Sequence, residues 1–321
     1  MDSPQHLKKR LKSVANINKI TKAMELVAAT KMRRSQEIAL ASRPYAFAAL
    51  DLLANLTRLE MSGRRASTEL PILLQQRKIK KVLFVLVASD KGLAGAFNSS
   101  LFRKFEKYLQ EHDAKYQEEK IFLAIGEKAF QYLSKKVSPV VRTTGLKKFT
   151  QVGDFTTVEQ VQPIADFLVN GYLEKQWDRV VVFSTNFKSA LKQEPMVRRV
   201  LPISFDYIKE TIQEIVPATG RFSDIISKIQ DTRNNNQTYT IEPSPEKVLE
   251  KLARHLLFMQ VYHVILEANA SEHSARRLAM KTASDNASDL GQKLNLQYNK
   301  VRQAGITNQI IEISAGAEAQ A

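Results

Sequence analysis

The C-terminal part of the sequence carries its longest helical pattern. From Pro245 to Ile313 the chain has no further proline, and its glycines there are Gly291 and Gly305. Such a segment predicts one continuous helix of roughly 100 Å, at about 1.5 Å per residue. A compact globule of 321 residues has a diameter of roughly 50 Å, so this helix must extend beyond any globular domain. Acid-to-base pairs four residues apart support the helix: Glu250 with Arg254, Glu272 with Arg276, and Asp289 with Lys293.

The N-terminal 60 residues carry a second helical pattern. Pro4, after Asp2 or Ser3, is typical of a helix start, and Pro44 is expected to kink or end the helix. Since each helix alone would expose an apolar stripe, we expect segments 1–60 and 245–314 to pair as a coiled coil, with 315–321 as a frayed tail. The expected seam has an average spacing of about 3.5 residues and runs through Leu7, Leu11, Val14, Ile17, Ile20, Met24 and Val27.

Residues 75–240 show a different pattern, in which short apolar runs alternate with helical segments. Strands are expected at KVLFVLVA, IFLAIG and RVVVFSTNF, and helices near 99–112, 127–136 and 157–175. This alternation is typical of an α/β domain with a central sheet. An enlarged segment at 206–240 is less regular, and its polar stretch RNNNQTYT is expected to be a loop before the C-terminal helix.

Composition limits the function classes. The formal charge of +15 and the pI near 9.8 favour an acidic partner, which leaves nucleic acid, an anionic membrane surface and an acidic protein open. The chain has no cysteine, which excludes disulfides, thiolate metal sites and cysteine nucleophiles. No segment approaches the roughly 20 apolar residues of a membrane span. The N-terminus lacks the apolar core of a signal peptide, so we expect a soluble or peripheral protein.

Motifs for catalysis are weak. The loop SDKGLAGAFN at 89–98 follows an apolar strand, as phosphate-binding loops do, but it lacks the Gly-Lys-Ser/Thr of a Walker loop. Gly92 and Gly95 therefore leave a nucleotide site and a plain tight turn both open. Two further groups lack a spacing typical of catalysis or metal binding: the acidic pair Asp285 and Asp289, and the histidines His255, His263 and His273.

The first 34 residues are strongly basic. They carry nine Lys or Arg residues against the acids Asp2 and Glu25. A nucleic-acid-binding arm and a solvated face of a coiled coil both fit this charge. The apolar seam through the same residues, and the lack of interleaved aromatic side chains for base stacking, favour the coiled coil.

Three segments, in order along the chain, closely resemble the gamma subunit of F-type ATP synthase. They are ITKAMELVAATKMRRSQ at 20–36, SDKGLAGAFN at 89–98, and SEHSARRLAMKTASDNASDLGQKLNLQYNKVRQAGITNQIIEIS at 271–314. The resemblance implies a long antiparallel coiled coil of the N- and C-terminal helices on a Rossmann-like α/β domain. One clear departure is that 206–240 is longer than in most relatives. In addition, Ala94 stands where many bacterial relatives have cysteine. The regulatory cysteine pair of chloroplast forms is missing too.

The resemblance also implies a function. The chain would be the rotating central stalk that couples transmembrane ion flow to ATP synthesis or hydrolysis at sites on the beta subunit, and would not itself be an enzyme. Its partners would be the alpha and beta subunits of the catalytic ring, the epsilon subunit and the membrane c-ring, with no cofactor, metal or nucleic acid. It would be peripheral on the cytoplasmic face of a bacterial cell membrane. The coupling ion, proton or sodium, and the main direction of the reaction are left open.

The family's contact positions map onto both terminal helices and the loop at 89–98. Asp90 and Lys91 would meet an acidic lever of the beta subunit, where glycines permit close approach of the backbone. A basic coiled-coil protein that binds nucleic acid and an α/β enzyme that binds nucleotides remain the alternatives. The implied contact residues are Met24, Lys31, Arg33, Arg34, Asp90, Lys91, Arg276, Arg302, Gln303, Thr307 and Glu312.

Overall fold

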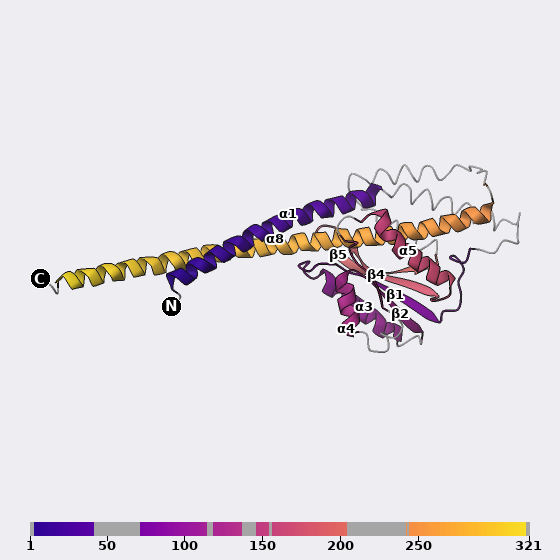
Figure 1. Ribbon diagram of the computed structural model, residues 1–321, viewed down its shortest axis with the longest axis horizontal. Helices are drawn as coiled ribbons and strands as arrows, with labels where there is room; N and C mark the ends of the chain where they lie inside the picture. The colour runs from indigo at the N-terminus through magenta and orange to yellow at the C-terminus, as the bar shows by residue number, and fades with distance from the viewer. Residues whose placement is uncertain are drawn as a thin grey trace. The chain divides into compact units, whose positions relative to one another are not determined.

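The computed structural model describes residues 3–41, 71–113, 118–136, 146–153, 156–203, 242 and 244–318 (Figure 1). These residues fall into two compact units, one of residues 31–275 and one made of 1–30 with 276–321. The segment 42–70, with Pro44, and most of the enlarged segment at 206–240 lie outside the described residues, and the expected domain boundaries stay a prediction. The elements are α1 (Pro4–Ala41), β1 (Lys81–Val87), α3 (Phe97–Asp113), β2 (Glu119–Ile125), α4 (Glu127–Lys136), β3 (Lys147–Phe149), α5 (Val158–Leu173), β4 (Arg179–Phe187), β5 (Gln193–Leu201) and α8 (Pro245–Glu318).

The larger unit is built on a five-stranded sheet in the order β3-β2-β1-β4-β5. The first four strands of that order are parallel, and β5 pairs antiparallel with β4 at the edge. The central strand β1 reads KVLFVLV and is buried from its second residue on. Such a continuous apolar run is what a parallel strand covered on both faces requires. The order β3-β2-β1-β4 matches the first four positions of the Rossmann strand order 3-2-1-4-5-6, and the predicted α/β domain is confirmed.

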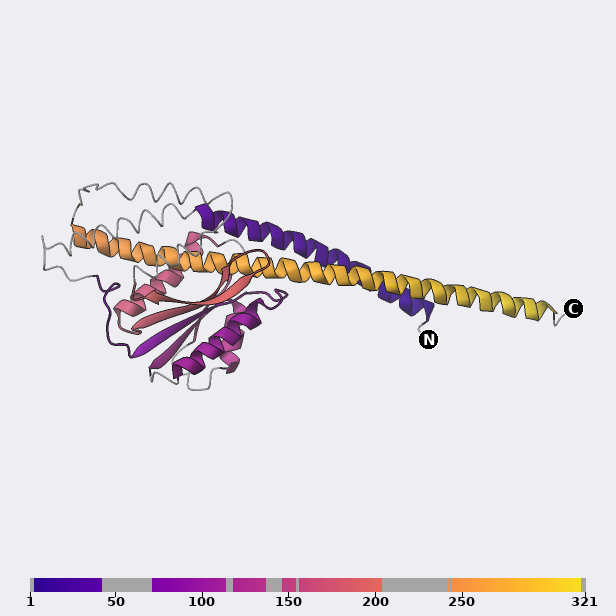
Figure 2. The ribbon, with the colours of Figure 1, turned by 180° about the vertical axis from the view of Figure 1, so that it is seen from behind.

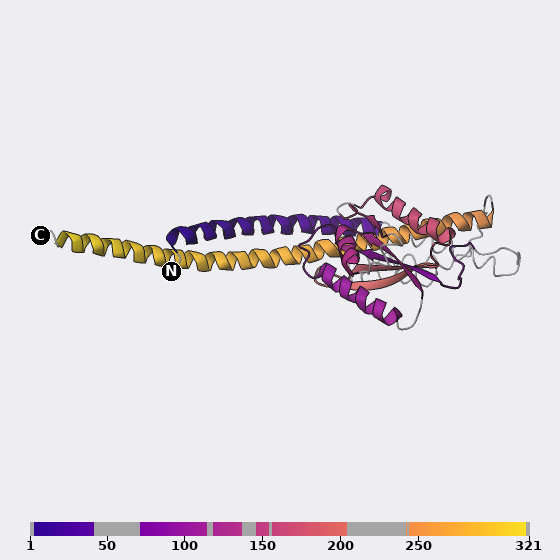
Figure 3. The ribbon, with the colours of Figure 1, turned by 60° about the horizontal axis from the view of Figure 1, so that its bottom comes forward.

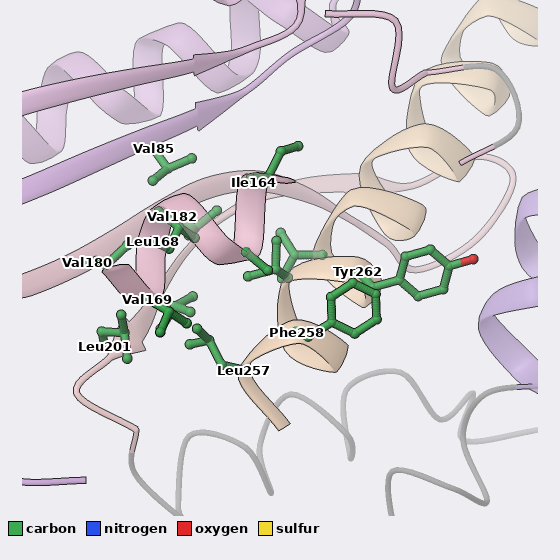
Figure 4. Close-up of a cluster of buried hydrophobic side chains, with 14 of the residues drawn as sticks. Val85, Ile164, Leu168, Val169, Val180, Val182, Leu201, Leu257, Phe258 and Tyr262 are labelled. Carbon is green, nitrogen blue, oxygen red and sulfur yellow. The ribbon is translucent and has the colours of Figure 1, made fainter. Parts of the chain in front are cut away.

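Alternate residues of β1 enter two separate cores. Phe84 packs with the buried faces of α3 and α4, whereas Val85 packs with α5 and the first part of α8. Figure 2 shows α3 on the face of the sheet opposite α8, and Figure 4 shows Leu168 of α5 with Leu257 and Phe258 of α8 in the second core. The first part of α8 is therefore an integral layer of this unit.

The other unit pairs the N-terminal part of α1 with the C-terminal part of α8 (Figure 3). The hydroxyl of Ser284 donates to Asn18 Oδ1 at 2.7 Å, and a Cβ at Gly291 would lie 3.8 Å from Val14. The position on α8 rises as the position on α1 falls, so the helices are antiparallel. The predicted pairing of the two terminal helices is confirmed.

The seam of this pair differs from the sequence prediction. Ile17, Ile20 and Val27 are 50%, 59% and 55% exposed, so their assignment to the seam was wrong. Each step of three residues turns only 300° around a helix, and successive steps of three drift away from the partner. The seam is formed by buried or half-buried positions that recur in alternating steps of four and three: Leu7, Leu11, Val14, Asn18, Thr21, Glu25 and Ala28 on α1, and Met280, Ser284, Ala287, Gly291, Leu294, Tyr298 and Val301 on α8.

The described helix ends follow local chemistry. The backbone N–H of His6 donates to Ser3 Oγ at 3.3 Å, and that of Leu7 donates to the Ser3 carbonyl at 3.1 Å, which makes Ser3 the N-cap of α1. At the other end, α8 continues past Ser314 to Glu318. The expected frayed tail at 315–321 is therefore helical as far as the structure describes it.

Candidate functional site

The loop after β1 is held by hydrogen bonds around Ser89 and Asp90. The backbone N–H of Ser89 donates to Asn98 Oδ1 at 3.2 Å, and Asn98 Nδ2 donates to Ser89 Oγ at 2.7 Å. Asp90 Oδ1 accepts from the N–H of Glu127, at the first residue of α4, and Oδ2 accepts from the N–H of Gln151, each at 3.0 Å. Asp90 thus joins three segments at the carboxyl edge of the sheet, which gives it a structural task as well as its predicted contact role.

The tip of the same loop is exposed. Lys91 and Gly92 are exposed, a Cβ at Gly92 would meet nothing within 4 Å, and Leu93 is 65% exposed with a φ of 63°. Gly95 also has a positive φ, 55°, so a side chain at this position would be strained. The loop therefore presents a basic and an apolar side chain on a turn whose base is fixed by hydrogen bonds.

On α1, the predicted contact residues differ in exposure. Met24 and Lys31 are half-buried, whereas Arg33 and Arg34 are exposed. Arg34 lies 4.0 Å from Glu37, one turn along the helix. An exposed pair of this kind contributes about 0–1 kcal/mol, so the guanidinium of Arg34 can exchange this partner for another carboxylate.

On α8, the predicted contact residues lie toward the C-terminus. Arg276 is half-buried, and Arg302 is exposed with its guanidinium 6.0 Å from the centre of the Tyr298 ring. The hydroxyl of Thr307 donates to the Gln303 carbonyl at 3.0 Å, and Gln303, Thr307 and Glu312 are all exposed. The same turns expose large apolar side chains, at Ile306, Ile310, Ile311 and Ile313.

The residues that sequence reasoning left aside are placed as follows. Asp285 and Asp289 are exposed on α8, in agreement with a solvated surface. His263 and His273 are buried, and His273 Nε2 lies 3.1 Å from the Gly153 carbonyl oxygen.

Among the described residues, no group of three or more His, Cys, Asp or Glu side chains is arranged to hold a metal ion. Within the same residues, no helix has the length and apolarity to cross a membrane.

One group of polar residues was missed by sequence reasoning. Arg198 of β5 and Glu267 of α8 form a buried ion pair at 2.8 Å, and Asn269, Ser271 and Ser274 of α8 make further buried hydrogen bonds. Their only signal in the sequence is a run of polar residues, NASEHS at 269–274, inside a helix that is otherwise apolar in this region.

Comparison with known proteins agrees with the resemblance. The family model described as ATP synthase matches residues 3–320. Proteins named ATP synthase gamma chain from Roseiflexus castenholzii and Opitutus terrae are 36% and 37% identical, over 100% of this chain and 99% and 100% of their own lengths.

Solved structures share the fold. A chain in the cryo-EM structure of the Tetrahymena thermophila mitochondrial ATP synthase central stalk and c-ring is similar with a TM-score of 0.57 and 21% identity, over 83% of this chain and 99% of that one. A chain of the Euglena gracilis mitochondrial ATP synthase gives a TM-score of 0.60 and 17% identity, over 99% and 94%. Given the full-length match to its bacterial relatives, this chain belongs to the ATP synthase gamma chain family.

Proposed function

We propose that the chain is the rotating central stalk of an F-type ATP synthase, which couples transmembrane ion flow to ATP synthesis or hydrolysis at sites on the beta subunit. The family match across residues 3–320 carries this proposal. The antiparallel pairing of α1 with α8 supports it, because such a pair can turn as one body. In this role the chain is not catalytic and acts from the periphery of the membrane.

The exposed surface of α8 supports contact with a surrounding ring. Ile306, Ile310 and Ile313 are 48%, 61% and 73% exposed in the free chain, and exposed apolar groups of this size favour burial in a partner. We assign this end of α8 to the alpha and beta subunits, with Arg302, Gln303, Thr307 and Glu312 among the contacts. The epsilon subunit and the c-ring would bind elsewhere on the chain.

The basic residues support contact with an acidic partner. Arg33 and Arg34 of α1 and Lys91 of the loop after β1 are exposed cations, which fits acidic levers on the beta subunits. Rotation would bring these cations to one beta subunit after another. The equilibrium between two states of a partner shifts only when a contact binds one state more tightly than the other. Unequal contacts of this kind would therefore exchange the nucleotide affinities of the sites on successive beta subunits.

Copurification tests this function. The tagged full-length chain, expressed in its native host, should bring down alpha, beta and epsilon subunits and the c-ring in stoichiometric amounts. Recovery of nucleic acid instead, with a steep dependence on salt, would favour the nucleic-acid-binding alternative. Calorimetry on the isolated chain addresses the other alternative, since tight stoichiometric binding of ATP would contradict a non-catalytic stalk.

A further inference from the structure

A short buried segment of α8 carries an unusual density of polar side chains. Glu267, Asn269, Ser271, His273 and Ser274 are all at most 6% exposed. The preceding turns of α8 are apolar and fill the core against α5 and the sheet. Polar groups are costly to bury, and these are satisfied by specific partners in the larger unit. We refer to residues 267–274 as the polar collar.

One face of the polar collar binds the antiparallel edge of the sheet. Glu267 Oε2 lies 2.8 Å from Arg198 Nη1, with both side chains 6% exposed. The Ser271 hydroxyl donates to the Thr185 carbonyl at 3.2 Å, and the Ser274 hydroxyl donates to the Ala190 carbonyl at 2.8 Å and accepts from Gln193 Nε2 at 3.2 Å. The three collar residues are spaced i, i+4, i+7, so they share one side of the helix.

The opposite face binds the segment that precedes α5. Asn269 Nδ2 donates to the Val152 carbonyl at 2.9 Å and also to Thr156 Oγ1. His273 Nε2 lies 3.1 Å from the Gly153 carbonyl oxygen, and about two turns before Asn269 the Tyr262 hydroxyl donates to the Thr156 carbonyl at 3.1 Å. At 100° per residue, Asn269, Tyr262 and His273 lie roughly 200°, 220° and 240° around the helix from Glu267.

A helix that is held by hydrogen bonds on two different sides resists rotation about its own axis. The hydrophobic effect has no preferred direction, so apolar packing fixes the rotation of a helix only through the fit of its side chains. Hydrogen bonds lose their strength within a few tenths of an ångström and tens of degrees. Because the two sets of bonds act on well-separated sides of the helix, a turn of α8 in either direction would strain both sets.

We propose that the polar collar is the torque-bearing joint of this chain, which fixes the rotational position of α8 on its α/β unit. This proposal rests on the proposed function as a rotating stalk. The Arg198–Glu267 pair is the central positioning contact. A buried ion pair often stabilises no more than apolar residues of similar volume, because both charges must leave water. Its directionality is what apolar replacements would not supply.

The decisive variant is R198M/E267L in the complete reconstituted complex. It removes both charges together, so neither is left buried and unpaired, and it keeps side-chain volume. The expected result is normal assembly and normal ATP hydrolysis without a gradient, but a roughly two- to tenfold lower ATP-driven ion pumping against an opposing gradient, and a reduced stall torque of single complexes. The matched control, E106Q/K136M, removes a cross-helix ion pair of 2.8 Å between α3 and α4 and should leave both quantities unchanged.

Three further outcomes test the proposed joint or the proposed function. Pumping under load by R198M/E267L that equals wild type would overturn the proposal. Should that variant fail to fold, S271A/S274A removes only hydroxyls from the same face, and an unchanged stall torque in this variant would likewise count against the joint. Failure of the proposed function would be visible separately, because the wild-type chain itself would then not copurify with the ring and c-ring subunits.

Discussion

Asp178 shows how a single carboxylate joins segments that are distant in the sequence. Its Oδ1 lies 2.7 Å from Arg77 Nε, and its Oδ2 accepts from the backbone N–H groups of Lys80 and Lys81 at 2.9 and 3.0 Å. Burial acts to raise the pKa of Asp178, but these hydrogen bonds and the Arg77 charge outweigh it, and the pKa is lowered. The ionised form therefore stabilises the start of β1.

This linkage predicts a pH dependence of stability. The pKa of Asp178 is lower in the folded state than its unfolded value of about 3.9. The contribution of ionised Asp178 to the free energy of unfolding is therefore fully present above the unfolded pKa, and it is lost as pH falls through the folded pKa. D178N should lower the free energy of unfolding by about 1–3 kcal/mol at pH 7. The difference from wild type, measured by urea titration, should shrink below about pH 4. E119Q, which breaks an exposed pair with Lys81, is the control and should change stability by less than about 1 kcal/mol.

Gly171 illustrates a requirement for space. A Cβ at this position would lie 2.1 Å from the ring of Trp177, which is 2% exposed and donates its indole N–H to the Leu168 carbonyl at 3.2 Å. G171A should lower the free energy of unfolding by about 1–3 kcal/mol. G305A meets nothing within 4 Å and should instead stabilise α8 by about 0.5–1 kcal/mol. Thermal unfolding that ranks G171A at or above wild type would contradict this prediction.

Single residues also mark where sequence reasoning stops. Asp90 was predicted as a contact residue through its motif, but its two hydrogen-bond partners lie 37 and 61 positions away along the chain. The partners of Glu267 and Asn269 are also far away in sequence, at Arg198 and Val152. No local pattern encodes such pairs, because they depend on how loops and helices meet once the sheet has formed.

Elements with strong periodicity were predictable, and weak ones were not. Strand β1 was predictable because it is a continuous apolar run, and α8 was predictable because its sequence has no proline after its first residue. β3 has three residues, and β5, QEPMVRRVL, is polar and contains Pro195; a proline in a strand is tolerated at a sheet edge, where its missing N–H is not needed. The seam of α1 was misassigned because polar Asn18, Thr21 and Glu25 occupy positions where apolar residues were expected.

The revised seam predicts effects of different size for substitutions at two apolar residues of α1. Leu7 is 2% exposed and Ile20 is 59% exposed. In the isolated chain, L7Q should lower the free energy of unfolding by about 0.5–3 kcal/mol, whereas I20Q should change it by no more than about 0.5 kcal/mol. Helix content followed by circular dichroism during thermal unfolding measures both. A larger loss for I20Q than for L7Q would restore the original seam.

At the scale of the whole molecule, the net charge of +15 favours binding to acidic partners. Arg33, Arg34 and Lys91 are exposed and lie outside both cores, so reversing their charge should leave folding intact. A single exposed pair contributes only about 0.2–1 kcal/mol, and several reversals are needed to observe an effect in the complex.

The triple variant R33E/R34E/K91E tests these contacts. The complex should assemble but pump less per ATP hydrolysed, because glutamates would face acidic levers. Part of the loss should be recovered as salt is raised, since the Debye length is about 8–10 Å at 0.1–0.15 M salt. A variant with the same number of reversals away from the proposed contacts, K104E/K107E/K128E on α3 and α4, serves as the control. If the triple variant pumped as well as wild type at low salt, the proposed contacts would be contradicted, and these residues would be solvated surface charges.

The antiparallel pairing of α1 with α8 has a consequence for biosynthesis. Asn18 and Ser284, which are hydrogen-bonded, are 266 positions apart, so α1 leaves the ribosome long before its partner exists. At about 5–20 residues per second, the wait is roughly 10–50 s. During this time the α/β unit can form its first strands, but Leu7 and its neighbours on the seam have nothing in this chain to cover them. The helix pair thus forms only once the C-terminal part of α8 has been synthesised, and a chaperone would have a long opportunity to bind the nascent α1 before then.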